Sequence, residues 1–95
     1  MKYKVILTTP FKRDLKKLKK RGKKIEKLND VVDMLAMEMV LDPKYRDHQL
    51  TNSKRFFACR ECHIEPDWLL VYKKSNQEVI LLLVETGTHS DLFNK

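Results

Sequence analysis

Side chains that can transfer protons gather in three short stretches of this chain. Asp-His-Gln-Leu occupies residues 47–50, Glu-Cys-His-Ile-Glu-Pro-Asp-Trp occupies residues 61–68, and Thr-Gly-Thr-His-Ser-Asp-Leu-Phe occupies residues 86–93. Each stretch contains one of the three histidines: His48, His63 and His89. Histidine titrates near neutral pH, so this residue type at the polar ends of apolar runs indicates acid–base chemistry.

The distribution of charge indicates what such chemistry would act on. The chain carries 20 lysines and arginines against 13 acidic residues, for a net charge of +7. Residues 1–27 contain 12 basic residues and only two acidic ones, a local balance of +10, whereas residues 28–95 have a balance of −3. This asymmetry predicts that the first third contacts nucleic acid or an acidic partner. A solvated, lysine-rich helix face is the alternative interpretation.

Length and composition predict one soluble domain that spans residues 1–95. Apolar residues make up 42% of the chain and charged residues 35%, as in globular proteins. No apolar run approaches the roughly 20 residues of a membrane helix, and the N-terminal apolar stretch is too short for a signal peptide. We therefore expect no membrane partner and a cytoplasmic location, where Cys59 and Cys62 stay reduced.

The N-terminal part must supply a strand and two helices. Residues 2–7 alternate apolar and polar side chains, which predicts a short strand. Thr9 is the expected N-cap of a first helix, with Pro10 at its first position. Apolar residues at i, i+4 and i+7 give this helix one buried stripe, and Gly22 is placed to end it. The stripe consists of Phe11, Leu15 and Leu18.

A second amphipathic helix is expected directly after Gly22, which makes an antiparallel helical hairpin. Its apolar positions alternate three and four apart; they are Ile25, Leu28, Val32, Leu35 and Met39. Met34, Met37 and Met39 are expected to fill gaps in the core.

The C-terminal half must supply the sheet. Residues 42–53 are polar enough to form a loop, and strands are predicted at residues 56–64, 68–73 and 79–84. Polar turns separate these three strands. The last two strands are nearly continuous apolar runs, so they should be central in the sheet. The predicted fold class is therefore α+β, with an N-terminal strand, a helical hairpin and a mostly antiparallel β-meander.

One motif in the first of these strands suggests a different chemistry. Residues 59–63, Cys-Arg-Glu-Cys-His, match the pattern for attachment of a c-type haem. In a strand, however, Cys59, Glu61 and His63 point to one face and Cys62 to the other, so the two thiols diverge. A zinc site would also need a second ligand pair at metal spacing, which the sequence does not offer. We therefore expect no cofactor and no metal.

From His48 onward the chain resembles the YafQ branch of the RelE-like toxins of bacterial toxin–antitoxin systems. The matching stretches are residues 47–50, 60–72 and 86–93. They cover about half the residues in order and at suitable spacing. The length, the basic helical hairpin and the C-terminal sheet agree over the rest.

The resemblance implies a ribosome-dependent mRNA interferase. Members of this family enter the ribosomal A site, cut the messenger there without a metal, and are neutralised by a cognate antitoxin. The partners implied are mRNA, the ribosome with its rRNA, and an acidic antitoxin, with operator DNA bound only through the antitoxin complex. By position, His48, His63, Asp67 and His89 match the family's catalytic residues, and the aromatic positions near the site are Trp68 and Phe93.

These residue types suit metal-free RNA cleavage. The reaction needs a base for the 2′-hydroxyl proton, an acid for the leaving 5′-oxygen, and donors for the charge on phosphorus. Histidines can be base or acid, Asp67 can be a base or can orient a histidine, and Trp68 and Phe93 can stack on bases. Arg60 is a candidate phosphate contact, although strand alternation points it away from His63. The sequence leaves the role of each histidine open.

One position departs from the family. Before Thr86 the family usually has an arginine suited to a phosphate, whereas this chain has Glu85. A carboxylate there opposes the developing negative charge. We therefore expect weaker cleavage than in a typical member, or reliance on other cations for the phosphate: Lys54, Arg55 or Arg60.

Two further functions stay open on the sequence alone. The chain can be a toxin-like module that binds ribosome and antitoxin without cutting, or a redox or metal protein built on Cys59 and Cys62. The enzyme and the module would both use the basic helices for ribosome or antitoxin contact. The candidate contact residues are Lys16, Lys17, Lys20, Arg21, Lys23 and Lys24.

Overall fold

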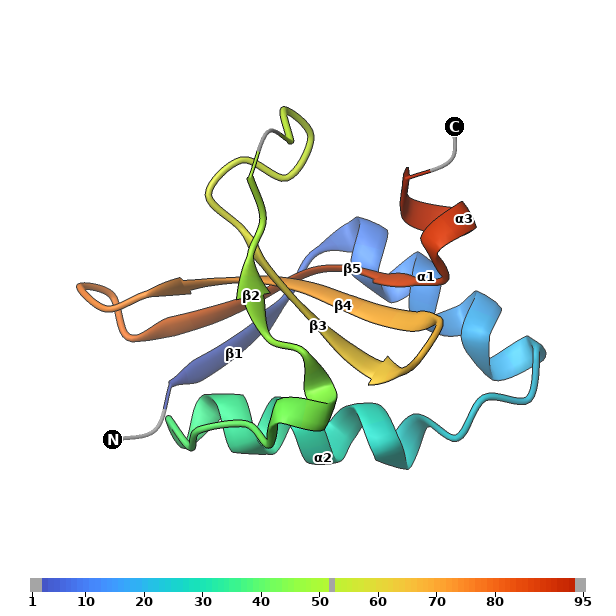
Figure 1. Cartoon of the computed structure of the whole chain (residues 1–95), viewed down its shortest axis with the longest axis horizontal. Helices are drawn as coiled ribbons and strands as arrows, with labels where there is room; N and C mark the ends of the chain where they lie inside the picture. Colours follow the sequence, from blue (N-terminus) through green and yellow to red (C-terminus); the bar gives the residue numbers. More distant parts are fainter. Residues whose placement is uncertain (1–2, 52, 94–95) are drawn as a thin grey trace.

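The structure is a computed structural model that describes residues 3–51 and 53–93. The strands in these residues form one mixed sheet. Five strands in this part of the chain form the sheet: Lys4–Leu7 (β1), His48–Gln49 (β2), Arg60–Glu65 (β3), Trp68–Ser75 (β4) and Ile80–Gly87 (β5). The helices are Thr9–Lys20 (α1), Ile25–Ala36 (α2), the 3₁₀-helix Pro43–Tyr45 (η1) and His89–Phe93 (α3). Figure 1 shows their arrangement.

The strand order is β1-β5-β4-β3-β2, so the two most apolar strands lie in the centre. Strand β1 pairs with β5 in parallel, and the other neighbours are antiparallel. This confirms the predicted α+β fold with its N-terminal strand, two helices and mostly antiparallel sheet. It also confirms the central position of β4 and β5 that their continuous apolar runs predicted.

Helix α1 begins one residue earlier than predicted and ends where predicted. Thr8, not Thr9, is its N-cap: the Thr8 hydroxyl accepts a hydrogen bond from the Phe11 amide at 3.2 Å. After Lys20 the chain turns through Gly22, whose φ of 83° lies in the left-handed region. The Lys23 amide then donates to the Leu18 carbonyl, which closes the helix as a glycine C-cap does.

Helix α2 is shorter than its apolar pattern predicted. It ends at Ala36, and Glu38 takes a left-handed φ of 58° just beyond it. Met37 and Met39 lie past the last turn and are 51% and 56% exposed, so the prediction that they are core residues was wrong. Met34 does pack against the main core.

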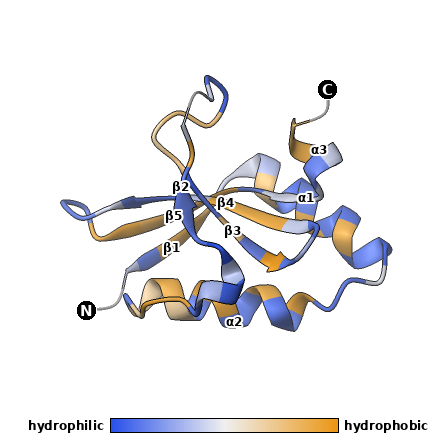
Figure 2. Cartoon of the chain, viewed as in Figure 1, coloured by the Kyte–Doolittle hydropathy of each residue, from blue (hydrophilic) through white to orange (hydrophobic). Residues whose placement is uncertain are grey.

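The main core lies between the sheet and helices α1 and α2. Figure 2 shows the apolar residues of α2 turned toward the strands and its polar residues turned outward. The buried cluster takes alternate residues from the strands, as expected where only one face meets the helices. Its strand members are Cys62, Ile64, Trp68, Leu70, Tyr72, Leu81 and Leu83.

The opposite face of the sheet carries a smaller cluster. Phe56, Cys59, Leu69, Val71 and Leu92 are buried there. Helix α3 and the loop between β2 and β3 supply its cover, and both lie above the sheet in Figure 1 while α2 lies below it. Cys59 thus belongs to this cluster and Cys62 to the main core, so the predicted divergence of the two thiols is confirmed.

The segment before β3 differs most from its prediction. The strand expected from residue 56 starts only at Arg60, because residues 54–58 form turns and Ala58 has a left-handed φ of 61°. The expected loop at residues 42–53 contains η1 and β2 within its described part. Asp42 starts η1 by accepting a hydrogen bond from the Lys44 amide at 2.9 Å.

A membrane-spanning helix would have to be longer and more apolar than any helix in the described residues.

Candidate active site

The strand register places a row of acidic and histidine residues on the face opposite α1 and α2. His48 of β2 pairs with Glu61 of β3, which pairs with Val71 of β4, which pairs with Glu85 of β5. Directly paired residues of neighbouring strands point to the same face. Neighbouring strands are spaced by about 4.8 Å, so the backbones of Glu61 and Glu85, two strands apart, are separated by about 10 Å.

The next row along the same face contributes the second histidine and leads to the third. His63 of β3 pairs with Leu69 of β4, and Leu69 pairs with Gly87 of β5. His89 begins α3 just after Gly87, and Asp67 lies in the turn between β3 and β4. The sheet therefore brings together all four residues that the sequence predicted as catalytic.

A buried carboxylate connects His48 with His63. Oε1 of Glu61 lies 3.2 Å from Nε2 of His48 and 3.6 Å from Nε2 of His63. The Glu61 side chain is only 7% exposed, and that of His63 11%, whereas that of His48 is 51% exposed. Glu61 was not among the predicted site residues. Its spacing of two from His63 in a predicted strand was the signal that could have identified it.

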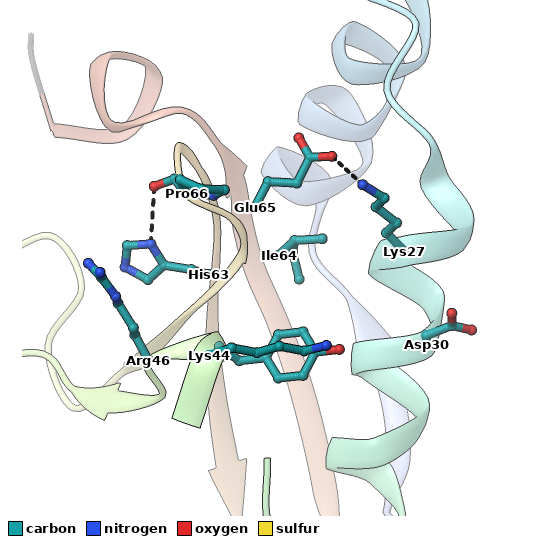
Figure 3. A pocket seen from close by; sticks show the side chains of 9 residues that line it. Lys27, Asp30, Lys44, Arg46, His63, Ile64, Glu65 and Pro66 are labelled. Atoms are coloured by element: carbon teal, nitrogen blue, oxygen red, sulfur yellow. Dashed lines mark hydrogen bonds and ion pairs between the residues drawn. The ribbon is translucent and has the colours of Figure 1, made fainter. Parts of the chain in front are cut away.

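Hydrogen bonds fix how His63 is oriented. Its Nδ1 lies 3.3 Å from the carbonyl oxygen of Pro66 (Figure 3). A carbonyl oxygen only accepts, so Nδ1 carries a proton and Nε2 is the nitrogen that faces Glu61. The other ring of the pair, His48, also has an oxygen at each nitrogen, because its Nδ1 lies 3.2 Å from the Gln49 carbonyl.

His89 is held by Asp67 through two contacts. Oδ1 of Asp67 accepts from the His89 backbone amide at 2.9 Å and lies 2.6 Å from Nδ1 of the ring. These contacts, the backbone one first, hold the pKa of Asp67 below its usual value of 3.8. Asp67 is therefore a carboxylate that orients the imidazole and leaves Nε2 of His89 open, since the ring is 55% exposed.

The rings of His63 and His89 lie close together. Their centroids are 5.7 Å apart and their planes are tilted by 56°. Two groups at this separation can both reach one phosphodiester through hydrogen bonds of about 3 Å. The arrangement can therefore donate and accept protons at a single reacting centre.

A capping arrangement fixes the start of α3, which carries His89. The Asp91 amide donates to the Thr88 hydroxyl at 3.1 Å, and the Thr88 amide donates to Asp91 at 3.0 Å. Arg21 of α1 adds an ion pair with Asp91 at 2.7 Å. Hydrogen bonding by Arg21 is the main reason that the pKa of Asp91 is well below its usual value. A Cβ on Gly87 would lie 2.9 Å from Asp91, so this approach needs glycine.

Three predicted phosphate contacts lie in different surroundings. Arg55 donates to both carboxylate oxygens of Glu85 at 2.7 Å and to the Leu92 carbonyl at 2.7 Å. Arg60 points to the other face of the sheet, as its alternation with His63 indicated, and its guanidinium pairs with Asp47 at 3.1 Å. Lys54 is exposed in the loop before β3.

The two aromatic residues predicted to stack on bases also differ. Trp68 has no exposed surface: it belongs to the main core, and its Nε1 donates to the Thr86 hydroxyl at 3.0 Å. The structure thus places Trp68 where a base cannot stack on it, contrary to the prediction. Phe93 is 44% exposed, with its ring 5.5 Å from that of Phe56 in an edge-to-face contact. It remains available to a base.

The basic residues of the helical hairpin fall into two groups. Arg21 pairs with Asp91, and Lys23 pairs with Glu65 at 2.9 Å, so these two also stabilise the fold. The others predicted as contact residues are exposed: Lys16, Lys17, Lys20 and Lys24.

Three residues of the site could also hold a metal. Within the described part of the chain, one ligand atom each from His48, Glu61 and His63 lie within 4.8 Å of one another. Two imidazoles and one carboxylate suit zinc or copper. The sequence did not reveal this set because the register of β2 on β3, and not a ligand spacing along the chain, brings His48 to Glu61.

Several solved structures with this fold are bacterial toxins, which indicates the class of this chain. A metal-bound toxin from Helicobacter pylori superimposes with a TM-score of 0.89 at 44% identity, covering 96% of this chain and 99% of that one. The Escherichia coli DinJ–YafQ toxin–antitoxin complex gives 0.86 at 32% identity, covering 98% and 99%.

The family is more specific than the class. The chain belongs to the YafQ family of bacterial toxins of type II toxin–antitoxin systems, whose family model matches residues 3–94. The mRNA interferase toxin YafQ of Escherichia coli strain B is 37% identical to it over 84 residues, which are 87% of each protein.

Proposed function

We propose that this protein is the toxin of a type II toxin–antitoxin system and that it is an endoribonuclease that cleaves mRNA. Its membership of the YafQ family supports this proposal, as do relatives that are named mRNA interferases. The observation that carries it is the convergence of His63 and His89, whose rings lie 5.7 Å apart on one face of the sheet. The Glu61 carboxylate contacts the ring of His63, and the Asp67 carboxylate contacts the ring of His89.

Cleavage proceeds by attack of the RNA 2′-hydroxyl on the adjacent phosphorus, without a metal. His89 is the base: its Nε2 accepts the proton of the 2′-hydroxyl, because Asp67 occupies its Nδ1. Asp67 orients this ring, because its Oδ1 contacts both the backbone amide and the Nδ1 of His89. Each positioned acid or base contributes roughly 10²–10⁴-fold to such a reaction.

His63 and His48 act together on the other side of the reacting phosphate. Both present Nε2 to the buried Glu61 carboxylate, which holds the two rings in place. His63, whose ring lies 5.7 Å from that of His89, supplies the proton for the leaving 5′-oxygen, and ring N–H groups beside the phosphate stabilise the charge that develops on its oxygens. Phe93 lies at the rim of the site and stacks on a base.

The ribosome and an antitoxin are the proposed macromolecular partners. We propose that cleavage occurs in the ribosomal A site, with the exposed lysines of α1 and its following loop on rRNA phosphates. Binding should then weaken steeply with salt. The E. coli relative was solved in a toxin–antitoxin complex, and an acidic antitoxin segment would suit the basic N-terminal third. Operator DNA would be bound only through that complex.

Translation of a defined message in a cell-free extract tests the proposal. Primer extension should reveal new 5′ ends with the wild-type protein and none with His89→Ala. Ser90→Ala is a matched control, because Ser90 is the exposed neighbour on α3 and its variant should cut normally. Slowed translation without cuts would favour the alternative, a module that binds the ribosome but does not cleave.

A further inference from the structure

A cavity of about 490 Å³ opens beside His63. Figure 3 shows it between α2, η1 and the end of β3. Its lining residues are Lys27, Asp30, Lys44, Tyr45, Arg46, His63, Ile64, Glu65 and Pro66. Its volume falls in the range of sites for small ligands, roughly 300–1,000 Å³.

The short β2 strand leaves this cavity open. Strand β2 pairs only with Arg60 and Glu61 of β3, so residues 62–65 have no strand on their outer side. Helix η1 contacts β3 there instead, and Lys44, Tyr45 and the following Arg46 line the cavity. The cavity therefore continues directly from the histidine cluster through His63, which belongs to both.

The charged residues of the cavity are not equally free to bind a ligand. Lys27 and Lys23 both pair with Glu65, at 2.8 and 2.9 Å, and so neutralise its carboxylate. Lys44 lies with its Nζ 5.2 Å from the centre of the Tyr45 ring. Arg46 is exposed, and its guanidinium has no hydrogen bond or ion pair to any residue that the structure describes.

Arg46 is unusual among the arginines near the site. Arg21, Arg55 and Arg60 each pair with a carboxylate. In Figure 3 the guanidinium of Arg46 instead points toward the ring of His63. An arginine that faces a histidine and has no carboxylate partner is placed to receive an anion, because guanidinium binds phosphate oxygens through two parallel donors.

We propose that this cavity is a subsite for one nucleotide of the RNA, next to the phosphate that is cleaved. Arg46 contacts that phosphate from the side of His63, and Lys44 contacts the next one. The base lies against the apolar wall formed by Tyr45, Ile64 and Pro66. The proposed function supplies the identity of the polymer, so this inference rests on it.

Arg46 would then replace the arginine that Glu85 displaces. In the sequence, Lys54, Arg55 and Arg60 were the expected substitutes. Arg55 and Arg60 each have a carboxylate partner. Lys54 lies in the loop before β3. Arg46 lies beside His63 at the edge of β3 that is farther from β5, the strand that carries Glu85. The sequence alone offered no reason to expect a phosphate contact there.

Binding of an RNA that cannot be cleaved tests the subsite directly. The probe is a trinucleotide of 2′-O-methyl RNA, titrated into the isotope-labelled full-length protein and followed by NMR. Amide signals of residues 44–46 and 63–65 should shift. Arg46→Asn should weaken binding about tenfold, and Arg13→Asn, which removes the same charge from an exposed site on α1, should not.

Asparagine is chosen because Arg46 has a left-handed φ of 48°, which this residue type tolerates well. Lys44→Ala serves as a second variant in case Arg46→Asn changes the fold, and thermal unfolding of each variant checks this. Shifts confined to other residues would overturn the inference. So would binding of inorganic phosphate as tight as that of the trinucleotide, because no nucleotide would then be recognised.

Cleavage in the cell-free extract separates this inference from the proposed function. Arg46→Asn should cut at least tenfold more slowly than Arg13→Asn, and Arg46→Lys should recover part of the rate. If the wild type cuts and Arg46→Asn cuts equally well, the subsite is wrong and the nuclease stands. If the wild type never cuts but the trinucleotide still shifts residues 44–46, the nuclease is wrong: the cavity then binds RNA, but its place beside a cleaved phosphate is overturned.

Discussion

Arg55 and Glu85 form an ion pair in which one guanidinium nitrogen donates to both carboxylate oxygens at 2.7 Å. The Glu85 side chain is 13% exposed and lies in the same row as Glu61 and His48. The carboxylate that seemed from the sequence to oppose RNA cleavage is thus neutralised by a neighbour. Arg55 also binds the Leu92 carbonyl and so ties the loop before β3 to α3.

The pair predicts that Arg55→Ala lowers cleavage through the charge that it leaves behind. An unpaired Glu85 repels the phosphate, so we expect a fall of about tenfold, equal to roughly 1.4 kcal/mol. Glu85→Ala added to Arg55→Ala should restore most of the rate. Initial cleavage rates of the two single variants and the double variant give the coupling. Equal rates for Arg55→Ala and the double variant would contradict this explanation.

The burial of Trp68 predicts opposite effects for the two aromatic candidates. Trp68→Phe should lower the thermal midpoint, because it leaves a cavity in the core and removes the donor to Thr86. Phe93→Leu should leave the midpoint almost unchanged and reduce cleavage severalfold, because a base loses its stacking partner. Thermal unfolding and primer extension on both variants check this. Normal cleavage by Phe93→Leu would remove Phe93 from the site.

Part of this site could be predicted from alternation within single strands. His63 and Glu61 share a face because they are two residues apart in β3, and Arg60 points away for the same reason. The helix boundary at Gly22 was also predictable, because left-handed φ values favour glycine. These features depend only on local geometry.

The rest of the site depends on contacts between distant segments. Strand β4 is apolar on both faces, so its sequence does not say which face meets α1, and the family resemblance led to the prediction that Trp68 lies at the site and not in the core. The Ser53 hydroxyl accepts a hydrogen bond from the Phe56 amide, and Ala58 has a left-handed φ. Both features belong to the turns before β3, and the strand therefore starts later than predicted. The position of Arg46 beside His63 requires η1 to cross the edge of β3, which no periodicity in residues 42–53 indicates.

Asp67 is predicted to act on cleavage through His89 alone. Asp67→Asn removes the charge beside Nδ1 of His89 and should lower the cleavage rate by about 10- to 100-fold. His89→Ala combined with Asp67→Asn should be no slower than His89→Ala. Because the folded-state pKa of Asp67 is already below 3.8, its own titration should not appear in the pH–rate profile above pH 4.5. An additional loss in the double variant would show that Asp67 has a separate role.

The cluster of His48, Glu61 and His63 predicts inhibition by zinc. A bound Zn²⁺ would occupy a ring nitrogen of each histidine and draw both rings away from the RNA, so micromolar zinc should bind the purified protein and stop cleavage. Glu61→Gln should weaken zinc binding, measured by calorimetry, at least tenfold, whereas the exposed Glu78→Gln should not. A chelator that removes zinc but spares ribosomal magnesium should leave the rate unchanged. Loss of activity with that chelator would contradict metal-free cleavage.

Asp91 predicts how stability depends on pH. Its pKa in the folded state is below the usual 3.8, chiefly through Arg21, so folding gains stability above that value and loses it as the pH falls through the folded-state pKa. At pH 7, Asp91→Asn should cost about 1 kcal/mol, or roughly 4–8 °C in the thermal midpoint.

Thermal unfolding at pH 7 and pH 3 measures this difference, with Asp33→Asn on the exposed side of α2 as the matched control. The destabilisation should shrink at pH 3, because the Asp91 carboxylate takes up a proton in the unfolded chain, where its pKa is the usual 3.8, while it stays ionised in the folded protein. Because Asp91 also fixes the first turn of α3, its variant should cut more slowly than Asp33→Asn at pH 7. A destabilisation that stays the same at both pH values would show that Asp91 acts through its shape and not through its charge.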